Sequence, residues 1–80
     1  MSKQVAAKPS VEQVSRILNR IMTLPDKGNI PYAKAYAEAA RGMTGTALDV
    51  QVLYVLCNLS HWIGEEARAS KKILKSFTGA

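Results

Sequence analysis

Cys57, His61 and Glu65 stand at intervals of four residues, so they would share one face of a helix. A thiolate, an imidazole and a carboxylate can each bind zinc. Neighbouring positions on a helix face stand about 6 Å apart, so three ligands on one straight helix cannot surround a single ion. A second chain would have to complete the ligand shell. We therefore predict that this triplet binds no metal.

Cys57 and His61 are also the residue types of a cysteine nucleophile and its general base. Cys57, however, ends the apolar run 53–57, where we expect its thiol to be hidden from any substrate. The acidic residues are scattered along the chain, and the sequence has no glycine-rich phosphate-binding loop. The sequence therefore predicts neither catalytic activity nor a cofactor.

The segment that holds these residues has the pattern of one long helix. Apolar and small residues recur at intervals of three or four from Leu48 to Phe77, which is the period of an α-helix. A helix over residues 47–77 would be roughly 46 Å long at about 1.5 Å per residue. The stripe consists of Leu48, Val52, Leu56, Leu59, Ile63, Ala67, Ser70, Leu74 and Phe77.

Gly64 is the weak point of this long helix. A glycine in a helix interior costs about 1 kcal/mol, so the chain could break there and begin another helix at Glu65 and Glu66. The apolar stripe keeps its phase across Gly64, however, because Leu59, Ile63 and Ala67 follow one another at helical spacing. This continuity favours one helix that is straight or gently kinked near Gly64.

Two shorter helices are expected before the long one. Ser10 and Gln13 have the spacing of a capping box, and Pro25 stops the first helix. Pro31 lies at the start of the second helix, where its missing N–H costs nothing, and Gly42 ends that helix. The second helix also carries a strip of small residues that lets another helix approach closely: Ala33, Ala37 and Ala40.

The sequence predicts an all-α protein with a flexible arm over residues 1–9 and a single helical domain over residues 10–80. The two short helices would pack on the long C-terminal helix. A chain of 80 residues with one cysteine forms no internal disulfide and has little chain to cover so long a stripe. We therefore expect dimerisation to complete the bundle. The predicted seam between the copies is Val52, Leu56, Leu59, Ile63, Leu74 and Phe77.

The formal net charge of +5 is unevenly placed. No lysine or arginine lies between Gly42 and Ala67, whereas residues 68–75 hold four cations and no acid. The helix dipole favours cations in the last turn, but it does not account for a cation more than two turns earlier. We predict that these residues contact a polyanion or an acidic protein. They are Arg68, Lys71, Lys72 and Lys75.

A second stripe beside the apolar one carries hydrogen-bonding and aromatic side chains. Such faces recognise protein surfaces or nucleic-acid bases. The residues of this predicted partner face are Gln51, Tyr54, Asn58, His61 and Glu65.

The expected location is the cytoplasm. Residues 1–9 contain lysines but no apolar core, unlike a signal peptide. The apolar run 48–63 is interrupted by polar residues and is too short to span a bilayer. A single thiol fits a reducing compartment. We expect no membrane partner.

The segment Leu53–Ala67 resembles the C-terminal helix of short uncharacterised proteins found in phages and other mobile elements. Those proteins carry Trp-Arg-Gly-Glu-Glu-Ala, whereas here Ile63 stands between Trp62 and Gly64. The likeness is confined to the C-terminal third of the chain. It implies a small accessory protein that works by binding.

These patterns predict a small non-enzymatic binding protein that acts as an oligomeric adaptor, inhibitor or regulator through an unidentified protein partner. The alternative is a nucleic-acid-binding protein without sequence preference, which uses the basic C-terminal end. Phosphate binding weakens steeply as salt rises, so a salt titration separates the two classes.

The first prediction concerns the triplet of Cys57, His61 and Glu65. Protein purified without added metal should contain no stoichiometric zinc, because these residues form an incomplete ligand set. Elemental analysis by mass spectrometry measures this directly. One zinc per chain or per dimer, lost in a His61→Ala variant, would contradict the prediction.

Overall fold

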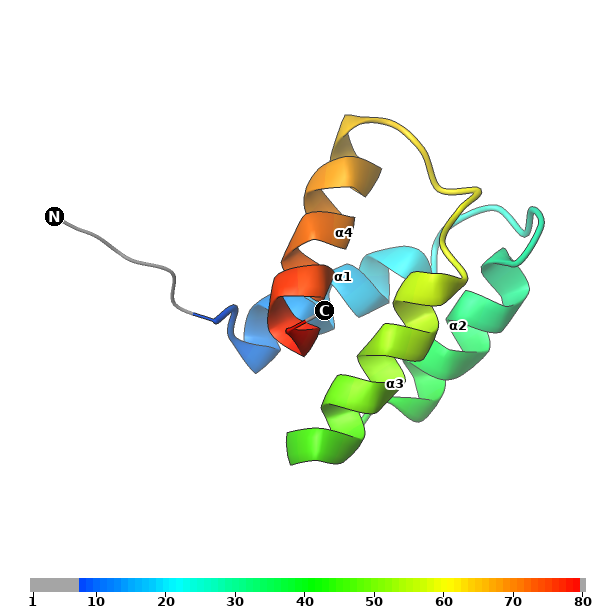
Figure 1. Ribbon diagram of the computed structural model, residues 1–80. Coiled ribbons are helices and arrows are strands. Elements are labelled where there is room, and N and C mark those ends of the chain that lie inside the picture. The colour runs from blue at the N-terminus through cyan, green and yellow to red at the C-terminus, as the bar shows by residue number, and fades with distance from the viewer. Residues whose placement is uncertain (1–7, 80) are drawn as a thin grey trace, which may run out of the picture.

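The computed structural model describes residues 8–79, which form four α-helices (Figure 1). These are α1 (Val11–Ile21), α2 (Ile30–Ala39), α3 (Gly45–Cys57) and α4 (Glu65–Thr78). Helices α2 and α3 lie side by side in opposite directions, and α1 crosses behind α4 in the view of Figure 1. The described residues contain no strand, which confirms the all-α prediction. Of the arm predicted over residues 1–9, residues 1–7 lie outside the described part.

Helix α1 begins as its sequence predicts. The backbone N–H of Gln13 donates to Ser10 Oγ at 3.1 Å, and the backbone N–H of Ser10 donates to Gln13 Oε1 at 3.1 Å. This capping box satisfies two of the amide groups that a helix start leaves without partners. The helix ends at Ile21, shortly before Pro25.

The prediction of one long C-terminal helix is wrong. The chain leaves helical geometry after Cys57 and begins α4 at Glu65, so residues 58–64 connect two separate helices (Figure 1). Gly64 sits directly before α4 with φ 109° and ψ −178°, a backbone conformation that is essentially restricted to glycine. The pattern of the stripe, which continued across Gly64, therefore did not mean a continuous helix.

The break is explained by which side chains it buries. In a continuous helix Leu59 and Ile63 would share the inner face, whereas in the structure Ile63 is 82% exposed. Leu59 is fully buried and Trp62 only 7% exposed, so the connection puts the large indole in the core instead. The backbone N–H of Trp62 donates to the carbonyl of Leu59 at 3.0 Å, which holds the turn. Helix α4 thereby folds back to contact α3 and α1.

One apolar core is shared by all four helices and the 58–64 connection. No polar or charged side chain is buried within residues 8–79. The predicted alanine strip of α2 is buried, and α2 and α3 are in close contact, as its small side chains allow. The core consists of Val14, Ile17, Leu18, Ile21, Leu24, Ile30, Ala33, Ala37, Ala40, Leu48, Val52, Val55, Leu59, Trp62, Ala67, Leu74 and Phe77.

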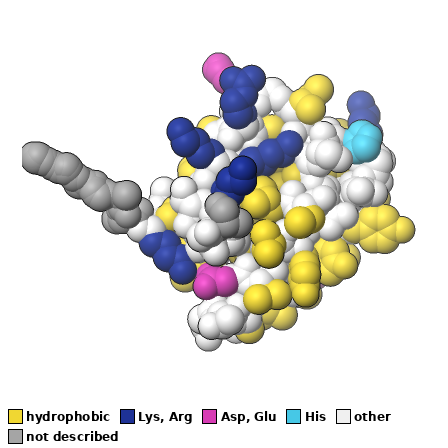
Figure 2. Space-filling model, viewed as in Figure 1, with side chains coloured by type: hydrophobic (Ala, Val, Ile, Leu, Met, Phe, Trp, Pro, Cys, Tyr) yellow, Lys and Arg dark blue, Asp and Glu magenta, His cyan; other side chains and the backbone are white. Residues whose placement is uncertain are grey.

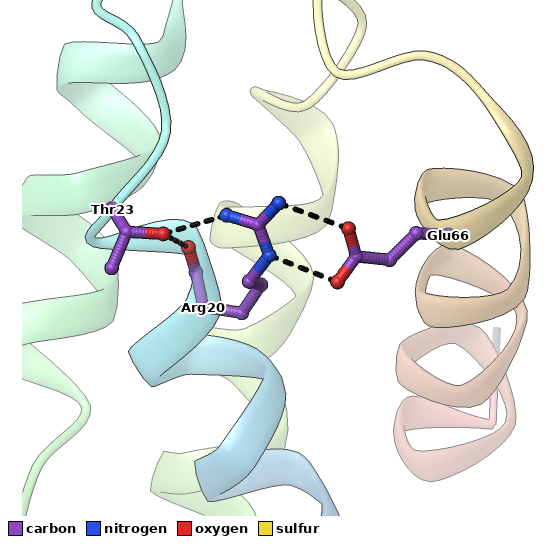
Figure 3. A network of polar contacts seen from close by, with 3 residues as sticks. All are labelled: Arg20, Thr23 and Glu66. Carbon is purple, nitrogen blue, oxygen red and sulfur yellow. Dashed lines mark hydrogen bonds and ion pairs between the residues drawn. The ribbon is translucent and has the colours of Figure 1, made fainter.

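A polar contact links α1 to the first turn of α4 (Figure 3). The Arg20 guanidinium donates to the Glu66 carboxylate at 2.9 and 3.0 Å, and also to Thr23 Oγ1 at 2.7 Å. The hydrogen bonds to Glu66 and its negative charge raise the pKa of Arg20 above its already high value. Glu66 is thereby directed toward α1, away from the cations on the opposite side of α4.

The second prediction tests the break. Replacing Gly64 by alanine should destabilise the protein by about 1–3 kcal/mol, because an L side chain disfavours this backbone conformation. In a continuous helix the same change would stabilise by about 1 kcal/mol, so the sign of the effect separates the two folds. Urea unfolding followed by circular dichroism measures it. Ser76→Ala, at an exposed site in α4, is the control and should change stability by no more than about 0.5 kcal/mol.

Candidate functional site

The break divides the predicted partner face among three segments. Gln51 and Tyr54 lie on α3, His61 lies in the connection, and Glu65 begins α4. The Gln51 amide donates to the Tyr36 carbonyl at 3.0 Å, and the Asn58 amide donates to the Tyr54 carbonyl at 2.9 Å. Both amides are half-buried and bind backbone groups of their own chain. These five side chains therefore do not form one continuous stripe.

His61 packs against the turn between α1 and α2. A Cβ atom added to Gly28 would overlap the His61 ring, so glycine allows this close approach. Gly28 also has φ +53°, a second reason for glycine at this position. His61 Nδ1 lies 3.5 Å from Ser60 Oγ. The ring is thus placed by two connecting segments rather than by the face of α3.

No group of three or more His, Cys, Asp or Glu side chains within residues 8–79 is close enough to hold a metal ion. The expectation that Cys57 is hidden is wrong, because this residue is exposed. Cys57 follows Val50, Leu53 and Tyr54 on the outward side of α3, at the spacing i, i+3, i+4 and i+7. An apolar sequence around a cysteine does not show which side of the helix the thiol occupies.

Exposed apolar side chains gather on α2 and α3, and we call this surface the α2–α3 face. The ring centroids of Tyr36 and Tyr54 are 5.5 Å apart, which joins the two helices at the surface. Figure 2 shows apolar side chains over the visible side of α3. A helix that is apolar around its whole circumference is normally buried on all sides, whereas α3 has one side open. The face consists of Tyr32 (62% exposed), Tyr36 (38%), Val50 (42%), Leu53 (37%) and Tyr54 (48%).

The second surface is a groove between α3 and α4 of about 480 Å³, which we call the α3–α4 groove. Leu56 lines it from α3, half-buried, and four basic side chains line it from α4. Figure 2 shows lysine and arginine side chains over α4 beside the apolar side chains over α3. The basic residues are the four predicted polyanion contacts, Arg68, Lys71, Lys72 and Lys75.

The acids that form ion pairs do so away from this groove. Asp26 pairs with Lys34 at 2.6 Å and Glu38 with Arg41 at 3.3 Å. Asp49 pairs with Lys8 at 3.5 Å, and Glu66 pairs with Arg20. Within residues 8–79, none of the four groove cations forms an ion pair. Within the described part of the chain, no carboxylate is therefore in direct contact with these four cations.

Most of the predicted dimer seam is covered by the chain itself. Val52, Leu59, Leu74 and Phe77 are core residues. Leu56 lines the α3–α4 groove and Ile63 is exposed on the connection. The apolar surface left open is instead the α2–α3 face. Its signal in the sequence is the second apolar side of α3, together with the spacing of Tyr32 and Tyr36 by one turn.

Comparison of the chain with protein-family models, with curated proteins and with solved structures gives no match. The resemblance to proteins of phages and mobile elements therefore stays a prediction. None of the four helices in residues 8–79 combines the length and apolar character that crossing a membrane requires.

The third prediction follows from the position of Cys57. In the native monomer its thiol should react with a maleimide at a rate within about threefold of the urea-unfolded chain, because the residue is exposed. Mass spectrometry of samples quenched over time measures the rate. Labelling that occurs only after unfolding would show that the outward side of α3 is covered.

Proposed function

We propose that this protein is a non-enzymatic adaptor that self-associates through the α2–α3 face and uses its other surfaces to bind a partner. The observation that carries the proposal is the α2–α3 face itself, an open surface of three tyrosines and two aliphatic residues. Tyrosine is enriched at the centres of protein interfaces, because it combines a large apolar ring with a hydroxyl group.

The distribution of charge favours a second copy as the occupant of this face. Two chains of net charge +5 repel each other, so they associate most easily where cations are absent. Helix α3 contains no lysine or arginine, and its Asp49 is paired with Lys8. Contact through the α3–α4 groove would instead bring eight cations together, four from each chain, none of which forms an ion pair within residues 8–79.

The area of the α2–α3 face determines how strongly two copies are expected to associate. An aromatic side chain buries roughly 150–250 Å², so the exposed fractions of the three tyrosines amount to on the order of 300 Å². Stable interfaces bury about 800 Å² per partner, and weak ones less than about 600 Å². Val50 and Leu53 add to the tyrosines without reaching the larger figure. The proposed dimer is therefore weak, with a dissociation constant on the order of micromolar or higher.

The competing function, nucleic-acid binding through the basic end of the chain, uses the four cations of the α3–α4 groove. It needs no dimer and places no demand on the tyrosines of α2 and α3. The two functions therefore concern different surfaces, which separate variants can test.

The fourth prediction is the self-association. Light scattering after size exclusion should show the mass rising from 8.7 kDa toward twice that value between about 10 and 500 μM. Leu53→Glu should raise the dissociation constant at least about tenfold, because it places a charge in the apolar face. Circular dichroism should show an unchanged helix content.

Ile63→Glu is the matched control, since Ile63 is the more exposed apolar residue but lies outside the α2–α3 face. This variant should associate like the wild type. A monomer at all concentrations would overturn the proposed self-association. A dimer that Ile63→Glu dissociates and Leu53→Glu leaves intact would place the interface on the connection instead.

A further inference from the structure

The α3–α4 groove combines a row of cations with an apolar wall. Arg68, Lys71, Lys72 and Lys75 lie at i, i+3, i+4 and i+7, so they share one side of α4 over about 10 Å. Leu56 faces them from α3. The methylene stems of lysine add apolar surface beneath their charged ends. The groove therefore offers apolar contact along its depth and positive charge along its rim.

Two residues of the α3–α4 groove also line a second hollow, which has a volume of about 260 Å³. Arg68 and Lys71 line it together with Trp62, Ile63, Gly64 and Ala67. Ile63, which is 82% exposed, thus lies beside the cations at the start of α4. Leu56 and Ile63 provide two apolar contacts along this row of cations. Arg68 and Lys71 line both hollows, so Leu56 and Ile63 both lie next to this pair of cations.

We propose that this groove binds an acidic, amphipathic segment of a partner protein. Carboxylates of the segment would pair with the groove cations, and an apolar side chain would contact Leu56. The inference names the partner class of the proposed adaptor and in that respect rests on the proposed function, but it does not require the dimer. Helical segments that bind in grooves present apolar anchors at i, i+3 or i+4 and i+7. These anchors span two helical turns, which is also the length of the row of cations on α4.

The lining of the groove favours such a segment over nucleic acid. Proteins that hold single strands combine cations with exposed aromatic rings on which bases stack. Among the described residues, the only aromatic side chain that lines either hollow is Trp62, which is 7% exposed. The exposed tyrosines lie on the α2–α3 face. Phosphate contacts alone would leave the apolar wall of Leu56 without a function.

The probe is a labelled helical peptide of about 16 residues, with leucines on one face and glutamates elsewhere. Its fluorescence anisotropy is followed at about 50 mM salt as protein is added. Three comparison probes are used. The first is a peptide of the same composition, scrambled so that its leucines share no helix face. The others are an oligoglutamate of equal charge and mixed-sequence DNA of about 20 nucleotides. The amphipathic peptide should bind at least about tenfold more tightly than either peptide control.

Two charge-matched double variants locate the site. Lys72→Glu with Lys75→Glu reverses two exposed groove cations and should weaken peptide binding at least about tenfold. Arg16→Glu with Arg41→Glu makes the same change in net charge at exposed residues that line neither hollow, and should weaken binding by no more than about threefold. Leu56→Ser should weaken binding, whereas Leu53→Ser, on the α2–α3 face, should not. Circular dichroism confirms folding of each variant.

Equal binding of the oligoglutamate would overturn the proposal, because it would make the apolar wall irrelevant. Equal losses in the two double variants would do the same, since only net charge would then matter. Binding of the DNA without the peptide would assign the groove to nucleic acid. Absence of binding by all four probes would also overturn the proposal. Peptide binding by a protein that stays monomeric would support the groove while removing the proposed self-association.

Discussion

The burial of Trp62 is the interaction on which the rest of the structure depends. The indole enters the core only because the chain leaves helical geometry after Cys57, and Gly64 supplies the backbone conformation that lets α4 begin in a new direction. Helix α4 then folds back to contact α3 and α1, so the chain covers four of the six residues predicted for a dimer seam. A continuous helix would have needed a partner for the same apolar surface.

This arrangement also decides which surfaces remain open. Helix α3 is apolar on two sides, and α4 and α2 cover only part of it, which leaves the outward tyrosines and aliphatic residues in solvent. Glu66 pairs with Arg20 on the side of α4 that faces α1, and the cations of α4 gather along the groove with α3. One apolar and one basic surface thus share α3 as their common element.

Features that depend on residues close together in the chain could be predicted from the sequence. Features that depend on how the helices pack could not. The capping box of Ser10 and Gln13 involves residues three apart, so neighbouring chemistry is enough to predict it. The alanine strip and the basic row follow from helical spacing alone. Whether Ile63 or Trp62 is buried depends on the surface that the rest of the folded chain offers, which a periodic pattern does not contain. The exposure of Cys57 was missed for the same reason.

The contacts between helices form a ring in which α1 meets α2, α2 meets α3, α3 meets α4, and α4 meets α1. Three of these four contacts join helices that follow each other directly in the chain. Among the helix contacts of residues 8–79, only that of α1 with α4 joins helices far apart in the sequence, and the pairing of Arg20 with Glu66 accompanies it. Chains dominated by such short-range contacts lose little loop-closure entropy before their contacts form, and they reach the native state rapidly. Among the helix contacts, the one that joins α1 to α4 therefore closes the longest loop and carries the largest loop-closure cost.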